Sequence, residues 1–170
     1  MSPPRLLLLS DRSQLPDGRC LERTVAECAS AGLAVMVLRE LDLSEAARAA
    51  LAVKLARHVT VISARTSLPA TAGVHLAAHQ PVVGSRHGRS CHDGSQLRQA
   101  VAQGAEWVTL SPVAPSPSKP GYGPVLGTAG VAGLVAEAAG TPSMHSAASM
   151  PPTPLTSGRP GHTAWPSWAP

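Results

Sequence analysis

Residues 107–124 read WVTLSPVAPSPSKPGYGP and carry the clearest fold signal in the chain. The first four residues form an apolar run typical of a buried strand, and a helical pattern begins near Thr128. The loop between them holds five prolines, which donate no backbone hydrogen bonds and cannot continue a sheet. Because Ser116, Ser118 and Lys119 add hydroxyl groups and an ammonium group, the loop suits a phosphate or diphosphate. The alternative is an ordinary proline-rich connection.

Short apolar runs and helical patterns alternate through residues 5–140. The expected strands are residues 5–9, 34–38, 59–62, 73–76, 89–92 and 107–110. Helical patterns follow Cys20, Ser44, Asp93 and Thr128, of which the last three suit N-caps. Strands that alternate with helices form parallel sheets with right-handed crossovers. The pattern therefore predicts an α/β fold, either a (β/α) barrel of the TIM type or a doubly wound sheet.

The composition changes abruptly after Gly140. Residues 141–170 hold seven prolines and no Asp, Glu or Lys, and they show no apolar period. Such a segment buries too little surface to offset the entropy of ordering it. We therefore expect one domain over residues 1–140 and a disordered, proline-rich tail over residues 141–170.

The composition of the whole chain excludes several classes of protein. Lys and Arg total 14 against 10 Asp and Glu, and no basic stripe with interleaved aromatic residues indicates nucleic-acid binding. No segment approaches the roughly 20 apolar residues of a membrane helix. The three cysteines form no C-x-x-C pair, which favours reduced thiols. We expect a cytoplasmic protein with neither nucleic acid nor membrane as partner.

Five short motifs, each at a predicted strand end, resemble motifs of one enzyme family. Leu9-Ser10-Asp11-Arg12 resembles Leu-Thr-Asp-Arg, and residues 37–44 (VLRELDLS) resemble Gln-Leu-Arg-Glu-Lys-Asp-Leu-Ser. Residues 73–76 (GVHL) and 88–92 (GRSCH) resemble Gly-Val-His-Leu and Gly-Arg-Ser-Val-His, and residues 111–120 resemble Gly-Pro-Val-Phe-Pro-Thr-Pro-Thr-Lys-Pro. By this resemblance, the chain is identified as a member of the thiamine-phosphate synthase and TenI family of (β/α)8 barrels. Because the last family motifs are missing after residue 140, the resemblance implies a truncated barrel with about six of eight β/α units.

The resemblance also implies the chemistry of the site, which in such barrels lies at the C-terminal ends of the strands. The synthases join a pyrimidine diphosphate to a thiazole phosphate with Mg²⁺. The TenI-type relatives aromatise a thiazole carboxylate phosphate by a proton shift and need no metal. The implied catalytic residue is His92. The implied substrate-binding residues are Arg39, Ser63, Ser90, Ser116, Ser118 and Lys119.

Departures from the family pattern favour the proton shift. Ala64 and Gln80 stand where the synthases carry the carboxylates that hold Mg²⁺, and neither side chain replaces a carboxylate. We therefore expect no resident metal, and Mg²⁺ only if the chain is a synthase. The alternatives are a synthase proper and a truncated, non-catalytic homologue that binds a phosphate or a partner. The open strand edges of an incomplete barrel also suggest a homo-oligomer.

Two other clusters of reactive side chains have simpler interpretations. Cys91 precedes His92 on a predicted strand, where neighbouring side chains point to opposite faces, so Cys91 belongs to the core. His75 and His79 have the spacing of a metal pair on a helix, but the segment is predicted as strand and loop. No zinc site is expected there.

Overall fold

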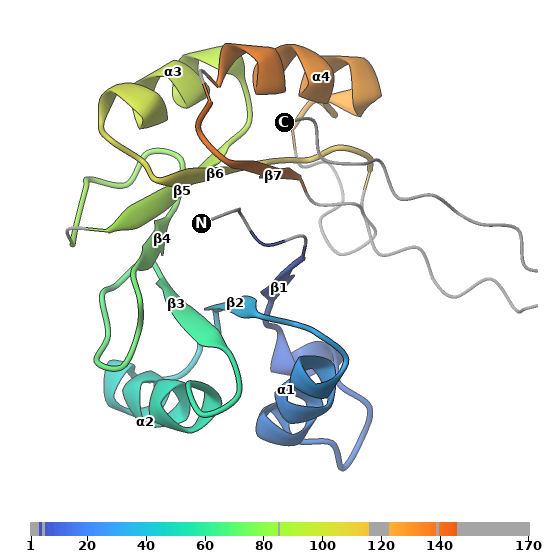
Figure 1. Cartoon of the computed structure of the whole chain (residues 1–170), viewed down its shortest axis with the longest axis vertical. Helices are drawn as coiled ribbons and strands as arrows, with labels where there is room; N and C mark the ends of the chain where they lie inside the picture. Colours follow the sequence, from blue (N-terminus) through green and yellow to red (C-terminus); the bar gives the residue numbers. More distant parts are fainter. Residues whose placement is uncertain (1–3, 5, 85, 116–122, 139, 146–170) are drawn as a thin grey trace, which may run out of the picture.

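The computed structural model describes residues 4, 6–84, 86–115, 123–138 and 140–145 of the 170-residue chain (Figure 1). Within them, one sheet contains seven parallel strands: β1 (Leu7–Leu9), β2 (Val35–Leu38), β3 (Thr60–Ala64), β4 (Val74–Leu76), β5 (His87–Cys91), β6 (Trp107–Leu110) and β7 (Ser143–His145). The helices described are η1 (Arg12–Gln14), a 3₁₀ helix, and four α-helices: α1 (Leu21–Ser30), α2 (Glu45–Leu55), α3 (Gly94–Ala102) and α4 (Gly127–Glu137). Among these described residues, no helix is long and apolar enough to span a membrane.

The sheet curls into a nearly closed ring with the helices on its outside (Figure 1). Each strand pairs in parallel with the next strand in the chain, and within the described residues β7 does not pair back to β1. The strand order never reverses, which rules out a doubly wound sheet. The prediction of an incomplete (β/α) barrel of the TIM type is thereby confirmed. A seventh strand, β7, lies beyond residue 140, where the sequence pattern ended.

Apolar side chains pack in two clusters between the ring and its helices, and in a smaller one inside the ring. The first cluster joins α1 and α2 to β2 and β3, and the second joins α3 and α4 to β5 and β6. Each fully buried Leu or Val contributes about 1.5–3 kcal/mol, so these outer clusters supply most of the hydrophobic stabilisation. The interior cluster contains Val37, Ile62 and Ala64, with Leu7, Val35 and Trp107 packed against it.

The alternation of strands and helices is broken on both sides of β4. Residues 65–73 lead from β3 to β4 and residues 77–86 lead from β4 to β5, and none of the described residues there is helical. The sequence likewise showed no helical pattern between the predicted strands 59–62 and 89–92. The reason is length, since a parallel crossover that contains a helix usually takes a dozen or more residues.

Hydrogen bonds from side chains to the backbone fasten these two crossovers to the sheet. Arg89 on β5 is only 1% exposed, and its Nη1 donates to the carbonyl oxygens of Ala77, Ala78 and Gln80 at 2.6–3.0 Å. The Gln80 amide donates in turn to the carbonyl oxygen of Arg65, which ties the second crossover to the first. These bonds replace the packing that a crossover helix would provide.

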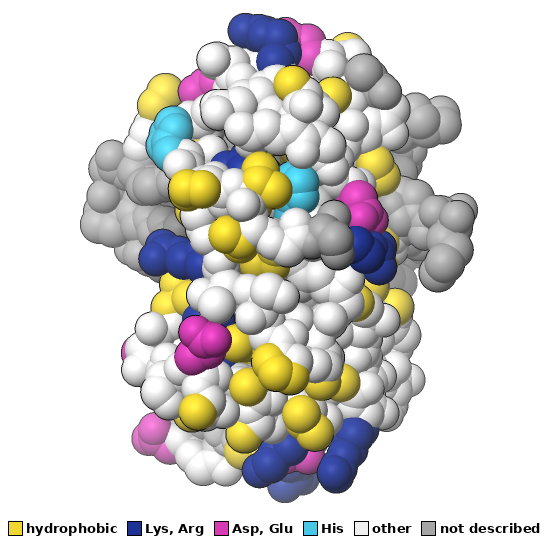
Figure 2. Space-filling model, turned by 90° about the vertical axis from the view of Figure 1, so that its left-hand side faces the viewer, with side chains coloured by type: hydrophobic (Ala, Val, Ile, Leu, Met, Phe, Trp, Pro, Cys, Tyr) yellow, Lys and Arg dark blue, Asp and Glu magenta, His cyan; other side chains and the backbone are white. Residues whose placement is uncertain are grey.

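The surface over β4 is consequently made of loops. Leu68 of the first crossover is buried, whereas Val82 and Val83 of the second are exposed. In Figure 2, which looks onto this side of the molecule, hydrophobic side chains are scattered among a few charged ones. Scattered apolar residues are normal on a protein surface and do not by themselves indicate a partner.

Side-chain caps start two helices as predicted. The Ser44 hydroxyl accepts a hydrogen bond from the Ala47 amide at 3.3 Å at the start of α2. Asp93 Oδ1 accepts from the Gln96 amide at 2.8 Å at the start of α3. Gly104 follows α3 with φ +78°, in the left-handed conformation that suits glycine after a helix.

The predicted Thr128 cap of the last helix is wrong, because α4 begins at Gly127 and its N-cap position is Leu126, two residues before Thr128. The amides of Leu126 and Gly127 donate to the carbonyl oxygens of Pro112 and Val113 at 2.8 and 3.1 Å. The backbone of the loop after β6 therefore anchors this end of the helix, and no side-chain cap is formed.

The indole of Trp107 fills the interior of the ring beside β4 and β5. Its Nε1 donates to Nδ1 of His75 at 3.1 Å, and the two rings are stacked with centroids 6.4 Å apart. A Cβ atom at position 88 would lie 2.0 Å from Trp107 Nε1, so Gly88 leaves the space that the indole occupies.

We expect Gly88→Ala to lower the free energy of unfolding by about 1–3 kcal/mol, the usual cost of overpacking a core. Urea denaturation followed by far-UV circular dichroism measures this change. The matched control is Gly133→Ala in α4, where a Cβ meets nothing within 4 Å. An alanine inside a helix should stabilise the protein by about 0.5–1 kcal/mol. Unchanged stability of Gly88→Ala would show that the indole does not occupy this place.

Candidate active site

Polar and charged side chains from several strands gather at the C-terminal mouth of the ring. Val37 lies in the interior cluster, so Arg39, two residues further along the chain, lies on the inward side. Ser90 pairs in register with Thr109 and bonds to it inside the ring, and by the same alternation His92 also lies on the inward side. The structure therefore places three of the predicted site residues, Arg39, Ser90 and His92, on the inward side of the ring near the C-terminal ends of their strands.

His92 is held by hydrogen bonds from two neighbouring elements. Its backbone amide donates to Gln96 Oε1 at 2.9 Å, so the N-terminal cap of α3 also fixes the end of β5. Its Nδ1 lies 2.6 Å from the carbonyl oxygen of Ser111, the residue after β6. A carbonyl oxygen only accepts, so Nδ1 carries the hydrogen and Nε2 of the neutral ring carries the lone pair. This tautomer can take up a proton at Nε2.

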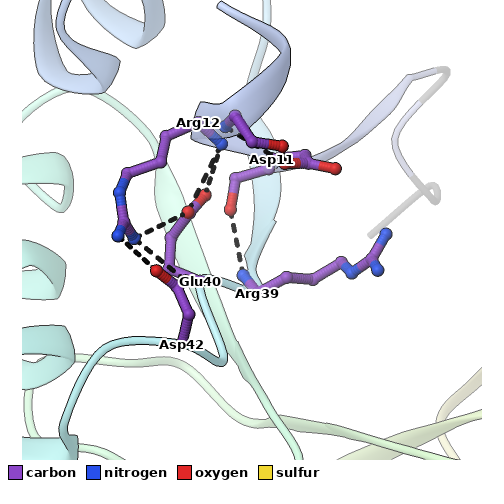
Figure 3. A network of polar contacts seen from close by, with 7 residues as sticks. Asp11, Arg12, Arg39, Glu40 and Asp42 are labelled. Atoms are coloured by element: carbon purple, nitrogen blue, oxygen red, sulfur yellow. Dashed lines mark hydrogen bonds and ion pairs between the residues drawn. The ribbon is translucent and has the colours of Figure 1, made fainter.

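A charged network on the outer side of the ring fixes the end of β2 (Figure 3). The buried Glu40 carboxylate accepts hydrogen bonds from the backbone amide and Nη1 of Arg12 at 3.2–3.3 Å. Arg12 also forms an ion pair with Asp42. Glu40 has φ +21°, an unfavourable value for a residue with a side chain, and its bonds to Arg12 hold it there.

Arg39 extends away from this network, as Figure 3 shows. Its backbone amide donates to the Ser10 hydroxyl at 2.9 Å, which joins the ends of β1 and β2. The positive charge of Arg39 is one of the causes that lower the pKa of the buried His75, so Arg39 lies within electrostatic reach of the interior.

A polar cluster that the sequence pattern did not predict lies inside the ring below the mouth. His75 Nε2 lies 3.1 Å from Ser90 Oγ and 3.2 Å from Thr109 Oγ1. Trp107 binds the other ring nitrogen of the same histidine. The spacing of His75 and His79 suggested only a metal pair, which the predicted strand excluded. The structure instead places His75 beside Ser90, a predicted substrate-binding residue.

His75 is uncharged at neutral pH. It is 7% exposed, and burial, followed by the positive charges of Arg39 and Arg89, lowers its pKa from 6.5 to about 4. Fixed positive charge near the interior therefore comes from the arginines and not from this histidine.

Ser63 does not join the residues at the mouth. Its buried hydroxyl donates to the Gly73 carbonyl oxygen at 3.3 Å and lies 3.4 Å from the Thr71 hydroxyl, both in the β3–β4 crossover. Its neighbour Ala64 belongs to the interior cluster, so the alternation turns Ser63 to the outer side. The remaining predicted substrate-binding residues, Ser116, Ser118 and Lys119, lie outside the described residues.

The two positions at which the family resemblance implies Mg²⁺ ligands, 64 and 80, carry no carboxylate. Ala64 has no side-chain oxygen, and both ends of the Gln80 amide are used within the crossover loops. Its Oε1 accepts from the Ala77 amide at 3.3 Å, and its Nε2 donates to the Arg65 carbonyl oxygen. No group of three or more His, Cys, Asp or Glu side chains in the described part of the chain could hold a metal ion.

Cys91 packs in the core, as the strand alternation predicts. It lies in the cluster between β5, β6, α3 and α4, and burial raises the pKa of its thiol to about 11. A thiol with this pKa is protonated at neutral pH and does not act as a nucleophile.

The ring of parallel strands, with polar side chains gathered where the strands end, defines a (β/α)-barrel protein whose candidate site lies at the C-terminal mouth. Residues 6–146 match the family model of thiamine monophosphate synthase, TMP-TENI. The chain belongs to this family, which confirms the resemblance read from its motifs.

Relatives support the same assignment. A protein of Geobacter sulfurreducens named as a putative thiamine-phosphate synthase is 36% identical over 140 residues, which cover 72% of this chain and 65% of that relative. The structure of a thiamine phosphate pyrophosphorylase from Pyrococcus furiosus superimposes with a TM-score of 0.66 and 14% identity, covering 82% of this chain and 83% of that one. At this identity the second match shows a shared fold alone.

Acid should destabilise the protein through His75. Between pH 6.5 and pH 4 the unfolded chain protonates this histidine while the folded chain keeps it neutral, so the free energy of unfolding falls as the pH falls. The loss should reach roughly 3 kcal/mol near pH 4. Urea denaturation at a series of pH values measures it. His75→Gln should be less stable at pH 7 but should lose this part of the slope, and an identical slope would contradict the assignment.

Proposed function

We propose that this protein is an enzyme of thiamine biosynthesis that binds a thiazole phosphate and aromatises its ring by a proton shift. The observation that carries the proposal is the hydrogen bond from His92 Nδ1 to the Ser111 carbonyl oxygen, which leaves the lone pair on Nε2. A general base needs such a lone pair beside its substrate, and histidine is the side chain most often used in this role.

In this reaction one proton leaves a carbon of the thiazole ring, is held on His92 Nε2 and returns to another carbon of the same molecule. The product is an isomer of the substrate, so no co-reactant is consumed. The Ser111 carbonyl oxygen stabilises the imidazolium that forms, because its hydrogen bond to Nδ1 is stronger when the ring is charged.

The phosphate group would lie at the mouth, near Arg39 and Ser90. Arg39 supplies a guanidinium group, and Ser90 supplies a hydroxyl that is half-buried and already fixed by hydrogen bonds. We further propose that Ser116, Ser118 and Lys119 bind the same phosphate from the loop after β6. Ser63 is left out of this proposal because its hydroxyl is turned to the outer side.

The second candidate is a synthase that displaces diphosphate. The 36% identity to a relative with that name favours it. Loss of diphosphate places negative charge on its oxygens, which synthases neutralise with a metal. Ala64 and Gln80 supply no carboxylate for such a metal, so the proton shift is the better match to the residues present.

His92→Ala should lower kcat for the isomerisation at least about 100-fold, the lower range for loss of a positioned acid–base group. The substrate and its aromatic isomer have different conjugated systems, so a change in ultraviolet absorbance follows the reaction. Release of pyrophosphate, measured with Mg²⁺ and both synthase substrates, tests the second candidate in parallel.

Two controls accompany this assay. His92→Ala should still melt cooperatively and should still be stabilised by thiazole phosphate, because the phosphate contacts are unchanged. His58→Ala, at an exposed position after α2, should keep full activity. Pyrophosphate release without isomerisation would establish the synthase. Stabilisation by thiazole phosphate with neither reaction would establish a non-catalytic homologue.

A further inference from the structure

The hydrogen bonds inside the ring form a chain that leads from Trp107 to the mouth. Trp107 Nε1 donates to Nδ1 of His75 at 3.1 Å, and His75 Nε2 faces the hydroxyl oxygens of Ser90 and Thr109 at 3.1 and 3.2 Å. The register places these residues on one face of the sheet, since His75 pairs with Gly88 and Ser90 pairs with Thr109. Three strands, β4, β5 and β6, therefore contribute to one connected set of bonds.

Trp107 decides which nitrogen of His75 carries the hydrogen. An indole N–H only donates, so Nδ1 must accept and carries the lone pair. Burial keeps the ring neutral at neutral pH, because it lowers the pKa to about 4. The single ring hydrogen of His75 then lies on Nε2, which donates to the Ser90 and Thr109 hydroxyl oxygens.

In this arrangement the oxygen of the Ser90 hydroxyl is used as an acceptor inside the ring, and its hydrogen is left as a donor. Its oxygen accepts from His75 Nε2 and, at the longer distance of 3.4 Å, from the Thr109 hydroxyl. A serine hydroxyl has two lone pairs and one hydrogen, so the hydrogen is what remains for a ligand. Ser90 is half-buried, two residues before His92 on the same side of the strand. It therefore presents a donor to the mouth.

We infer that Trp107 and His75 are positioning residues that orient the Ser90 hydroxyl as a hydrogen-bond donor to a phosphate oxygen of the substrate. This inference rests on the proposed function, in which Ser90 binds the phosphate group. It adds a requirement on the substrate, because a fixed donor favours a group that only accepts, such as a phosphate oxygen. A group that must itself donate, such as an ammonium, finds no acceptor at this point.

The tautomer of His75 can be observed directly in the full chain. Long-range ¹H–¹⁵N correlation spectra of protein labelled with ¹⁵N-histidine distinguish a ring nitrogen that carries hydrogen from one that does not. We expect hydrogen on Nε2 of His75 at pH 7, with the signal assigned by its loss in His75→Gln. Hydrogen on Nδ1 would overturn the inference, whatever the protein binds.

Inorganic phosphate serves as the binding probe. Ser90→Ala should weaken phosphate binding about tenfold, which is the order expected for a lost hydrogen bond to a charged group. Trp107→Phe keeps an aromatic ring but removes the N–H, and should weaken binding by about threefold to fivefold because the Ser90 bond is misdirected and not lost.

A double-mutant cycle separates positioning from a merely structural role. Because Trp107 acts through Ser90, Trp107→Phe should change phosphate affinity no further in a Ser90→Ala background. Equal weakening in both backgrounds would mean that Trp107 acts on the site in another way, and would overturn the inference. A change in melting temperature alone, with phosphate affinity unchanged, would also overturn it.

Failure of this inference is distinguishable from failure of the proposed function. If the unmodified protein isomerises its substrate and Trp107→Phe binds phosphate as tightly, the inference fails and the function stands. If the unmodified protein binds no phosphate, both fail. If Trp107→Phe shows no cooperative melt, its phosphate affinity is not used. The inference is then tested by the tautomer of His75 in the unmodified protein.

Discussion

The hydrogen bond between Trp107 and His75 is the contact on which the interior of the ring depends. It requires an indole in place of any smaller ring, and it requires glycine at position 88, where a Cβ would lie 2.0 Å from the indole nitrogen. The indole fills space that aliphatic residues fill elsewhere in the interior. Its N–H also gives a hydrogen-bond donor to a ring nitrogen of the buried His75. The indole therefore fills the interior and also bonds to His75. His75 is in turn held in one place beside the hydroxyls of Ser90 and Thr109.

The mouth is held rigid by side chains that bond to backbone groups where the strands end. Gln96 accepts from the His92 amide, and Ser10 accepts from the Arg39 amide. Glu40 accepts from the Arg12 amide on the outer side of the same strand ends. Each bond fixes a residue that is itself at the site or beside it. A reactive group held in this way needs little reordering when a ligand binds, which is where binding free energy is otherwise lost.

The sequence predicted those parts of the structure that depend on local pattern. Ser44 and Asp93 cap their helices, and the strand β2 is a continuous apolar run. Features that depend on distant contacts were missed. The start of α4 is set by backbone carbonyls of the loop after β6, and the crossovers around β4 are tied down by Arg89. His75 could have been found from register, because parallel pairing puts it beside the inward Ala64 and directs it away from solvent. Ser63 was wrongly expected among the substrate-binding residues. It is next to the inward Ala64 and therefore points outward, as the same argument from strand register shows.

The charges around the interior explain why loss of the metal carboxylates need not abolish chemistry. The positive charge there comes from arginines, which stay protonated at any physiological pH, while His75 is neutral. An anion bound at the mouth would therefore meet the Arg39 guanidinium and the Ser90 hydroxyl without a metal ion between them. A carboxylate at position 64 would partly cancel that positive charge unless a cation neutralised it, whereas Ala64 leaves it uncancelled. Removing a carboxylate and its metal together keeps the balance of charge, and the proton shift that we propose for His92 needs neither.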